Sequence, residues 1–173
     1  MRFSACIEWL FAAETPDVPN RIRAAKAAGL DAVEFWRFSN KDLAAVKTAL
    51  DETGLPLAGI LCEPISPLTN PDAHPQFLEG VQTSLAAAQR LGAGMMIAQA
   101  GDDQPGVARA AQHAAIVRVL QEAARILEGS GVVLAWEGEG HTAYPETRCV
   151  TAAVNKYLIN LEPPRHQTTC PAA

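Results

Sequence analysis

The sequence predicts an α/β protein in which parallel strands alternate with helices. One pattern occurs four times: an amphipathic helical stretch, a glycine, a short apolar run, and a carboxylate or amide where that run ends. A glycine suits the left-handed position that closes a helix, and such short runs are typical of strands buried on both faces. The unequal spacing of the four glycines favours a barrel or a doubly wound sheet over a stacked repeat. These glycines are Gly29, Gly54, Gly92 and Gly129.

Five strands are expected, because five short apolar runs are bounded by turn-forming residues. They are Arg2 to Trp9, Ala32 to Trp36, Leu57 to Cys62, Met95 to Gln99 and Val132 to Trp136. Four helices are expected between them, because apolar residues recur there at helical spacing. They are Asn20 to Ala28, a helix that carries Leu43, Val46 and Leu50 behind a Ser39 or Asn40 cap, Pro75 to Leu91, and Arg109 to Leu127.

Polar side chains follow the predicted strands where each strand ends. They are Glu8, Glu34, Glu63, Gln99 and Glu137. Because the carboxyl ends of parallel strands meet at one edge of a sheet, this edge is the expected site, and its carboxylates suggest a metal or a proton transfer.

Two of these carboxylates have a competing structural interpretation. Glu137 follows five apolar residues, and it either binds a metal or substrate there or caps a neighbouring loop. Glu34 is followed closely by Arg37, and an ion pair between the two is the favoured interpretation.

Composition narrows the range of partners. The net charge of -5 and the lack of a Lys/Arg run disfavour nucleic acid as a partner.

The longest apolar run, Met95 to Ala100, is too short to cross a bilayer, and the N-terminus lacks the layout of a signal peptide. A cytoplasmic location is therefore expected. The four cysteines form no CxxC pair, and Cys6 and Cys62 are expected to be reduced and buried in strands.

The pattern stops after Glu137. Residues 1–137 are therefore expected to form one domain, and residues 138–173 an irregular, proline-rich tail of unknown role. Val150 to Leu161 is the one candidate for regular structure in that tail.

Three segments, Arg2 to Phe11, Ala27 to Trp36 and Ala98 to Gly101, resemble hydroxypyruvate isomerases of the xylose-isomerase-like group of TIM barrels. The resemblance covers residues 2 to 137. Since a complete barrel needs about 250 residues, it implies a partial (β/α)8 barrel of about five parallel strands and four helices. The open edge of the fifth strand predicts poor solubility or a homo-oligomer that closes the gap.

The resemblance also implies chemistry. Family members hold a divalent metal, Mg²⁺ or Mn²⁺, with carboxylates and an amide, and move a proton between adjacent carbons of a small hydroxy-carbonyl substrate through an enediol. Glu137 stands where the family glutamate acts as metal ligand and acid/base, and Glu34, Glu63 and Gln99 are candidates for substrate binding. The match ends there, because Gly138 follows in place of the family's proline and no Tyr-Asp-x-Tyr-His segment occurs between Gly138 and Ala173.

Three hypotheses remain open from the sequence. The first is an isomerase that interconverts hydroxypyruvate and tartronate semialdehyde or a similar pair. The second is a truncated or frame-disrupted barrel fragment without catalysis. The third, a metal-dependent endonuclease on the same fold, is disfavoured by the acidic balance.

Overall fold

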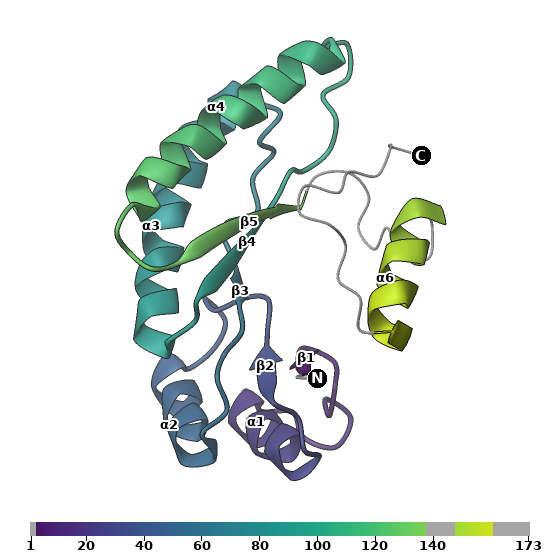
Figure 1. The fold of residues 1–173 in the computed structure, drawn as a ribbon. Helices are drawn as coiled ribbons and strands as arrows, with labels where there is room; N and C mark the ends of the chain where they lie inside the picture. Colours follow the sequence, from purple (N-terminus) through teal and green to yellow (C-terminus); the bar gives the residue numbers. More distant parts are fainter. Residues whose placement is uncertain (1–2, 138–147, 161–173) are drawn as a thin grey trace. The chain divides into compact units, whose positions relative to one another are not determined.

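The computed structural model describes residues 3–137 and 148–160 of the chain. It divides into two compact units, residues 1–136 and 137–173. Strands and helices alternate along the first unit (Figure 1). Its strands are β1 (Ser4–Cys6), β2 (Ala32–Glu34), β3 (Ile60–Leu61), β4 (Met95–Gln99) and β5, which runs from Val133 to Glu137. Its helices are α1 (Val18–Ala27), α2 (Leu43–Thr53), the short 3-10 helix η1 (Pro71–Ala73), α3 (His74–Leu91) and α4 (Arg109–Leu127).

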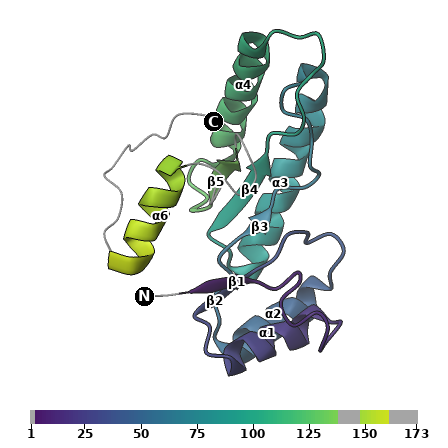
Figure 2. The same cartoon turned by 90° about the vertical axis from the view of Figure 1, so that its right-hand side faces the viewer.

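The strands lie side by side in the order of the sequence. β1 pairs in parallel with β2, and β3 pairs in parallel with β4, which borders β5. The two sheets meet at a parallel bridge between Val33 and Leu57, where the Ala58 N–H donates to the Val33 carbonyl at 2.7 Å. In a doubly wound sheet the strand order reverses at one point. The sequential order found here therefore favours the barrel over the doubly wound sheet. Figures 1 and 2 show α1 to α4 along one side of the strands, as in a barrel wall.

Local signals fix the helix ends. Gly54 and Gly92 close α2 and α3 in the left-handed conformation, as expected from the repeated pattern. The cap of α2 is Asp42, whose carboxylate accepts from the N–H groups of Ala44 and Ala45. The expected Ser39 or Asn40 cap is wrong, because the loop before α2 extends further than the apolar pattern suggests.

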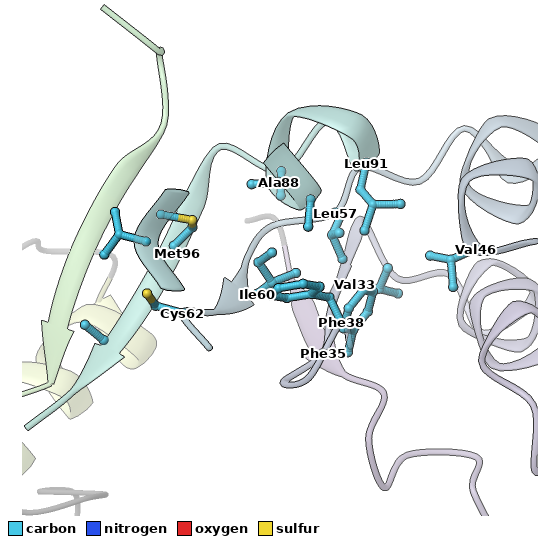
Figure 3. Packing of buried hydrophobic residues seen from close by; sticks show 14 of the residues in the cluster. Val33, Phe35, Phe38, Val46, Leu57, Ile60, Cys62, Ala88, Leu91 and Met96 are labelled. Atoms are coloured by element: carbon cyan, nitrogen blue, oxygen red, sulfur yellow. The ribbon is translucent and has the colours of Figure 1, made fainter. Parts of the chain in front are cut away.

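One face of the sheet, which we call the helix face, is fully buried. Its side chains belong to one apolar cluster with residues of all four helices. Figure 3 shows part of this cluster, with Val46 of α2 and Leu91 of α3. Val33, Phe35 and Met96 are between 0% and 1% exposed. Each fully buried side chain of this size contributes about 1.5–3 kcal/mol to folding. The helix face comprises Val33, Phe35, Ile60, Cys62, Met96 and Ala98.

The opposite face, which we call the open face, is only partly covered. It carries the alternate residues of the same strands, and Cys6, Glu34, Met95, Ile97 and Gln99 are all of intermediate exposure. Val133 of β5 is 63% exposed. The expectation that the strands are buried on both faces therefore holds for β3, whose Ile60 and Leu61 are both buried. It is wrong for β2 and β4, whose alternate residues are partly exposed on the open face.

The second unit contains one described helix, at the segment that the sequence analysis named as its candidate for regular structure. Helix α6 spans Arg148–Asn160, near the candidate Val150 to Leu161, so the tail is not irregular throughout. Residues 138–147 and 161–173 lie outside the described residues. The predicted class, a partial TIM barrel of five parallel strands, is confirmed, with this fifth α-helix in addition.

Two further expectations concern cysteines and membranes. Cys6 and Cys62 are reduced, as predicted, although only Cys62 is fully buried. Within the described ranges, none of the helices has the length and apolar character that a membrane span requires.

Candidate active site

The predicted site residues end their strands as expected. Glu34, Gln99 and Glu137 are the last residues of β2, β4 and β5, and Glu63 follows two residues after β3. Because these strands are parallel, all four positions lie at the carboxyl edge of the strands. The side chain of Glu137 lies outside the described residues, so its proposed chemistry stays a prediction.

Glu8 is engaged in holding the loop after β2. Its Oε1 accepts from the N–H groups of Trp36 at 3.1 Å and Arg37 at 3.3 Å. The same oxygen pairs with Nζ of Lys41 at 2.7 Å, and the two side chains are only 17% and 5% exposed. This carboxylate is therefore committed to the protein's own backbone and to one buried cation.

Lys41 is the residue that sequence reasoning missed. Its ammonium group also donates to the Arg37 carbonyl at 2.6 Å and to Asn40 Oδ1 at 3.1 Å, and it lies 4.9 Å from the centre of the Phe35 ring. No local signal marks this role, because Glu8 is separated from Lys41 by 33 positions in the sequence.

Glu63 holds the same loop from the other side. Its Oε2 accepts from the N–H groups of Phe38 at 2.8 Å and Ser39 at 3.0 Å, and its Oε1 accepts from the Ser39 hydroxyl at 2.9 Å. Both oxygens are used, so these contacts favour a structural role over the predicted substrate-binding role.

A surface pocket of about 510 Å³ lies beside Glu63. Arg37 lines it from the loop after β2, and α3 forms its other wall. Gly80 of α3 packs so closely on the segment after β3 that a Cβ there would clash with the Glu63 carbonyl oxygen. The remaining lining residues are Phe38, Ser39, Pro64, Gln76, Glu79 and Thr83.

Glu34 differs from its two neighbours. Among the described residues its carboxylate forms no hydrogen bond or ion pair, and the expected pair with Arg37 is not present. It is of intermediate exposure and stands opposite Cys6 in the β1–β2 register. Among the strand-end carboxylates whose side chains the structure describes, Glu34 is therefore available for a ligand.

The neighbouring thiols are held in their neutral form. Burial raises the pKa of Cys6, and the nearby Glu34 and Glu8 carboxylates raise it further. Burial likewise raises the pKa of Cys62 to about 11. Neither cysteine supplies a thiolate nucleophile at neutral pH.

The described residues do not make a metal site by themselves. They contain no group of three or more His, Cys, Asp or Glu side chains placed to hold a metal ion. Oε1 of Glu8 binds backbone N–H groups and Lys41, and both oxygens of Glu63 bind donors of the loop after β2. These described side chains alone therefore do not hold a divalent cation.

Two tryptophans stand beside this edge. Trp9 follows Glu8, and Trp36 follows the buried Phe35. Their ring centres lie 4.5 Å apart at an interplanar angle of 79°, and Trp9 is 71% exposed. Each tryptophan follows a predicted site or core residue in the sequence, but only the fold shows that the two rings are in contact.

Comparison with known proteins identifies the family. The family described as "Xylose isomerase-like TIM barrel" matches residues 22–153. The chain belongs to this family. Two proteins named as hydroxypyruvate isomerases, from Danio rerio and Xenopus laevis, are each 32% identical over 77% of this chain. The chain spans about half the length of these relatives, 52% of each.

Solved structures show the same xylose isomerase-like fold. An AP endonuclease of family 2 from Brucella melitensis has a TM-score of 0.73 at 22% identity, over 83% of this chain and 57% of that protein. The 3-keto-D-glucoside 4-epimerase YcjR from E. coli has a TM-score of 0.64 at 15% identity, over 91% and 63%. The IolI protein, solved with a zinc atom, has a TM-score of 0.64 at 14% identity, over 78% and 51%.

Proposed function

We propose that this chain is an isomerase of the hydroxypyruvate isomerase type. It interconverts hydroxypyruvate and tartronate semialdehyde, or a similar small hydroxy-carbonyl pair. The observation that carries the proposal is the 32% identity to the two proteins named for this activity across 77% of the chain. The available Glu34 carboxylate at the strand ends supports it.

The reaction requires one proton transfer between adjacent carbons. A base removes a proton from the hydroxymethyl carbon of hydroxypyruvate, and protonation of the former carbonyl oxygen gives the enediol. An acid then returns a proton to the neighbouring carbon while the original hydroxyl oxygen loses its proton and becomes the aldehyde oxygen. No atom is gained or lost. In this proposal Glu137 is the acid/base, while Glu34 and Gln99 bind the hydroxyl and carbonyl oxygens, and a carboxylate in this role adds roughly 10²- to 10⁴-fold in rate.

A divalent cation, Mg²⁺ or Mn²⁺, is part of the proposal through the family resemblance alone. Bound near the substrate oxygens, such an ion would stabilise negative charge on them. Glu137 is the proposed ligand, and the described residues do not complete its set.

The test is turnover of hydroxypyruvate by the purified protein with Mg²⁺ or Mn²⁺, and again after treatment with EDTA. We expect Glu137→Gln to abolish turnover and Glu34→Gln to raise KM. Glu52→Gln is the matched control, because Glu52 pairs with Arg23 at the surface, with side-chain exposures of 51% and 44%. Equal turnover in the Glu137→Gln protein and the wild type would contradict the assignment.

The second candidate is a barrel fragment without catalysis. It is favoured by the absence, within the described residues, of a group of side chains fit for a metal. It predicts a folded protein that shows no turnover with any cation, while a relative of full length is active in the same assay.

We propose further that the protein acts in the cytoplasm on small molecules and does not bind nucleic acid. The net charge of -5 supports the last point, because phosphate binding needs clustered cations. A gel shift of duplex DNA at low salt would contradict it.

A further inference from the structure

We propose that the pocket between the loop after β2 and α3 binds a zwitterionic small molecule, a free amino acid with an uncharged polar side chain. This pocket is separate from the proposed active site, because Glu34 and Gln99 do not line it. Its volume of about 510 Å³ is within the usual range for small-molecule sites. The proposal depends on two opposite charges that line this pocket without pairing.

One wall of the pocket carries a cation and the other an anion. Arg37 lies on the loop and Glu79 lies on α3, and both are exposed. Among the described residues, neither charged group forms an ion pair or a hydrogen bond. Long side chains of opposite charge attract each other across any gap that they can span. The walls of the pocket therefore hold these two groups too far apart for direct contact.

Glu63 fixes the spacing between the two walls. Its carboxylate accepts from the N–H groups of Phe38 and Ser39 in the loop after β2. Its backbone N–H donates at 2.9 Å to the hydroxyl oxygen of Ser84, a fully buried residue of α3. The helix also packs against the Glu63 carbonyl oxygen through Gly80, where a side chain would clash. One residue thus joins the loop to the helix.

The backbone of Arg37 is held on both sides. Its N–H donates to Glu8 Oε1 at 3.3 Å, and its carbonyl oxygen accepts from Lys41 Nζ at 2.6 Å. The side chains of Glu8 and Lys41 are themselves paired and largely buried. The guanidinium group is therefore presented from a preformed backbone, which lowers the entropy lost when a ligand binds.

The arrangement of charges selects a zwitterion. A guanidinium group binds a carboxylate through two parallel hydrogen bonds, and a carboxylate accepts hydrogen bonds from an ammonium group. An amino acid carries both groups, so one small molecule can bridge the two walls. A simple anion would be repelled by the carboxylates of Glu63 and Glu79, and a simple cation would leave Arg37 unpaired.

The rest of the lining indicates the side chain of the ligand. Gln76 and Thr83 lie on α3, and Ser39 lies on the loop. Amide and hydroxyl groups carry no charge, and they both donate and accept hydrogen bonds. They therefore fit an amide or a hydroxyl group on the ligand.

The experiment is isothermal titration calorimetry with L-glutamine as the probe. Two analogues each lack one charge, since N-acetyl-L-glutamine has no ammonium group and L-glutaminamide has no carboxylate. All three are added to the wild type and to Arg37→Gln, Glu79→Gln and Arg90→Gln. Arg90 is the matched control, because it is an exposed cation of α3 that does not line the pocket.

We expect L-glutamine to bind saturably to the wild type and to Arg90→Gln with equal affinity. Loss of either charge from the ligand should weaken binding to the wild type roughly five- to thirtyfold, as for a hydrogen bond to a charged group. Arg37→Gln should bind L-glutamine and L-glutaminamide equally, because the partner of the carboxylate is gone. Glu79→Gln should likewise bind L-glutamine and its N-acetyl analogue equally.

Three outcomes would overturn the proposal: no saturable heat with L-glutamine, equal affinity in all four proteins, or analogue losses that persist unchanged in the pocket variants. Glycyl-L-glutamine, whose two charges lie further apart, distinguishes a free amino acid from a peptide. Tighter binding of this dipeptide than of L-glutamine would contradict the assigned ligand class. Circular dichroism checks that each variant is folded.

Discussion

The two faces of the sheet use the same strands for different purposes. Val33 and Phe35 on the helix face are at most 1% exposed, whereas Glu34 between them is partly exposed and lacks a partner among the described residues. Stability therefore depends on one set of alternate residues, and the proposed chemistry depends on the other. Substitutions on the two faces should change different measurements.

The largest effect is expected on the helix face. Phe35→Ala should lower the free energy of unfolding by about 3–5 kcal/mol, because it removes a large side chain from a closed apolar cluster. Urea denaturation followed by circular dichroism measures this. Trp36→Ala, on the next residue, should cost less than half as much, and equal losses would contradict the division between the faces.

The next effect concerns the ion pair that holds the loop after β2. Lys41→Met should destabilise the protein by about 2–4 kcal/mol, because it leaves the Glu8 carboxylate largely buried without its cation. Adding Glu8→Gln should restore part of this loss, since an amide oxygen still accepts from the Trp36 and Arg37 N–H groups. If the double variant is no more stable than Lys41→Met alone, the unpaired charge of Glu8 is not the cause of the loss.

A pH effect should arise from Cys62 on the helix face. Its pKa is raised from 9.0 to about 11 by burial, so the folded protein keeps a proton that the unfolded chain loses first. The protonated Cys62 thiol therefore contributes roughly 2–3 kcal/mol to the free energy of unfolding. This contribution is fully present below about pH 9 and is lost as the pH rises towards 11. Urea denaturation at a series of pH values between about 8 and 11 measures this. The free energy of unfolding should fall less with pH for Cys62→Ala than for the wild type. Parallel profiles would contradict the assigned burial effect.

The smallest effect on stability is expected at the edge of β5. Val133 is 63% exposed, so Val133→Lys should change the free energy of unfolding by no more than about 0.5 kcal/mol. It should nevertheless reduce self-association, because a charge on an edge strand opposes pairing with another strand. Sedimentation velocity at micromolar concentration compares the two proteins. A wild type that remains monomeric would remove the proposed homo-oligomer.

The fold was predictable where its signals are local. The glycines after α2 and α3 mark the ends of those helices because no other residue adopts their conformation as easily. The order of the strands needed the structure, since a barrel and a doubly wound sheet share the same local pattern. The segment of α6 was named as a candidate for regular structure, but its type stayed open because the prolines around it dominate the composition of that region.

The placement of the candidate residues at the strand ends was predictable from the sequence, but their contacts were not. Strand ends located Glu34, Gln99 and Glu137 correctly at the carboxyl edge. Sequence could not separate Glu34 from Glu8 and Glu63, because the donors that engage those two lie between 24 and 33 positions away along the chain. The same limitation hid Lys41.

The most direct test of the central claim is deuterium exchange into the substrate. Hydroxypyruvate is incubated in D₂O with the protein and Mg²⁺, and proton NMR follows its hydroxymethyl signal. This reports proton removal even when the second half of the reaction is slow. We predict loss of that signal with the wild type and with Phe35→Leu, which leaves the strand ends unchanged, but not with Glu137→Gln. Exchange at the same rate in all three proteins, or only at the rate without protein, would contradict a catalytic role for the strand ends.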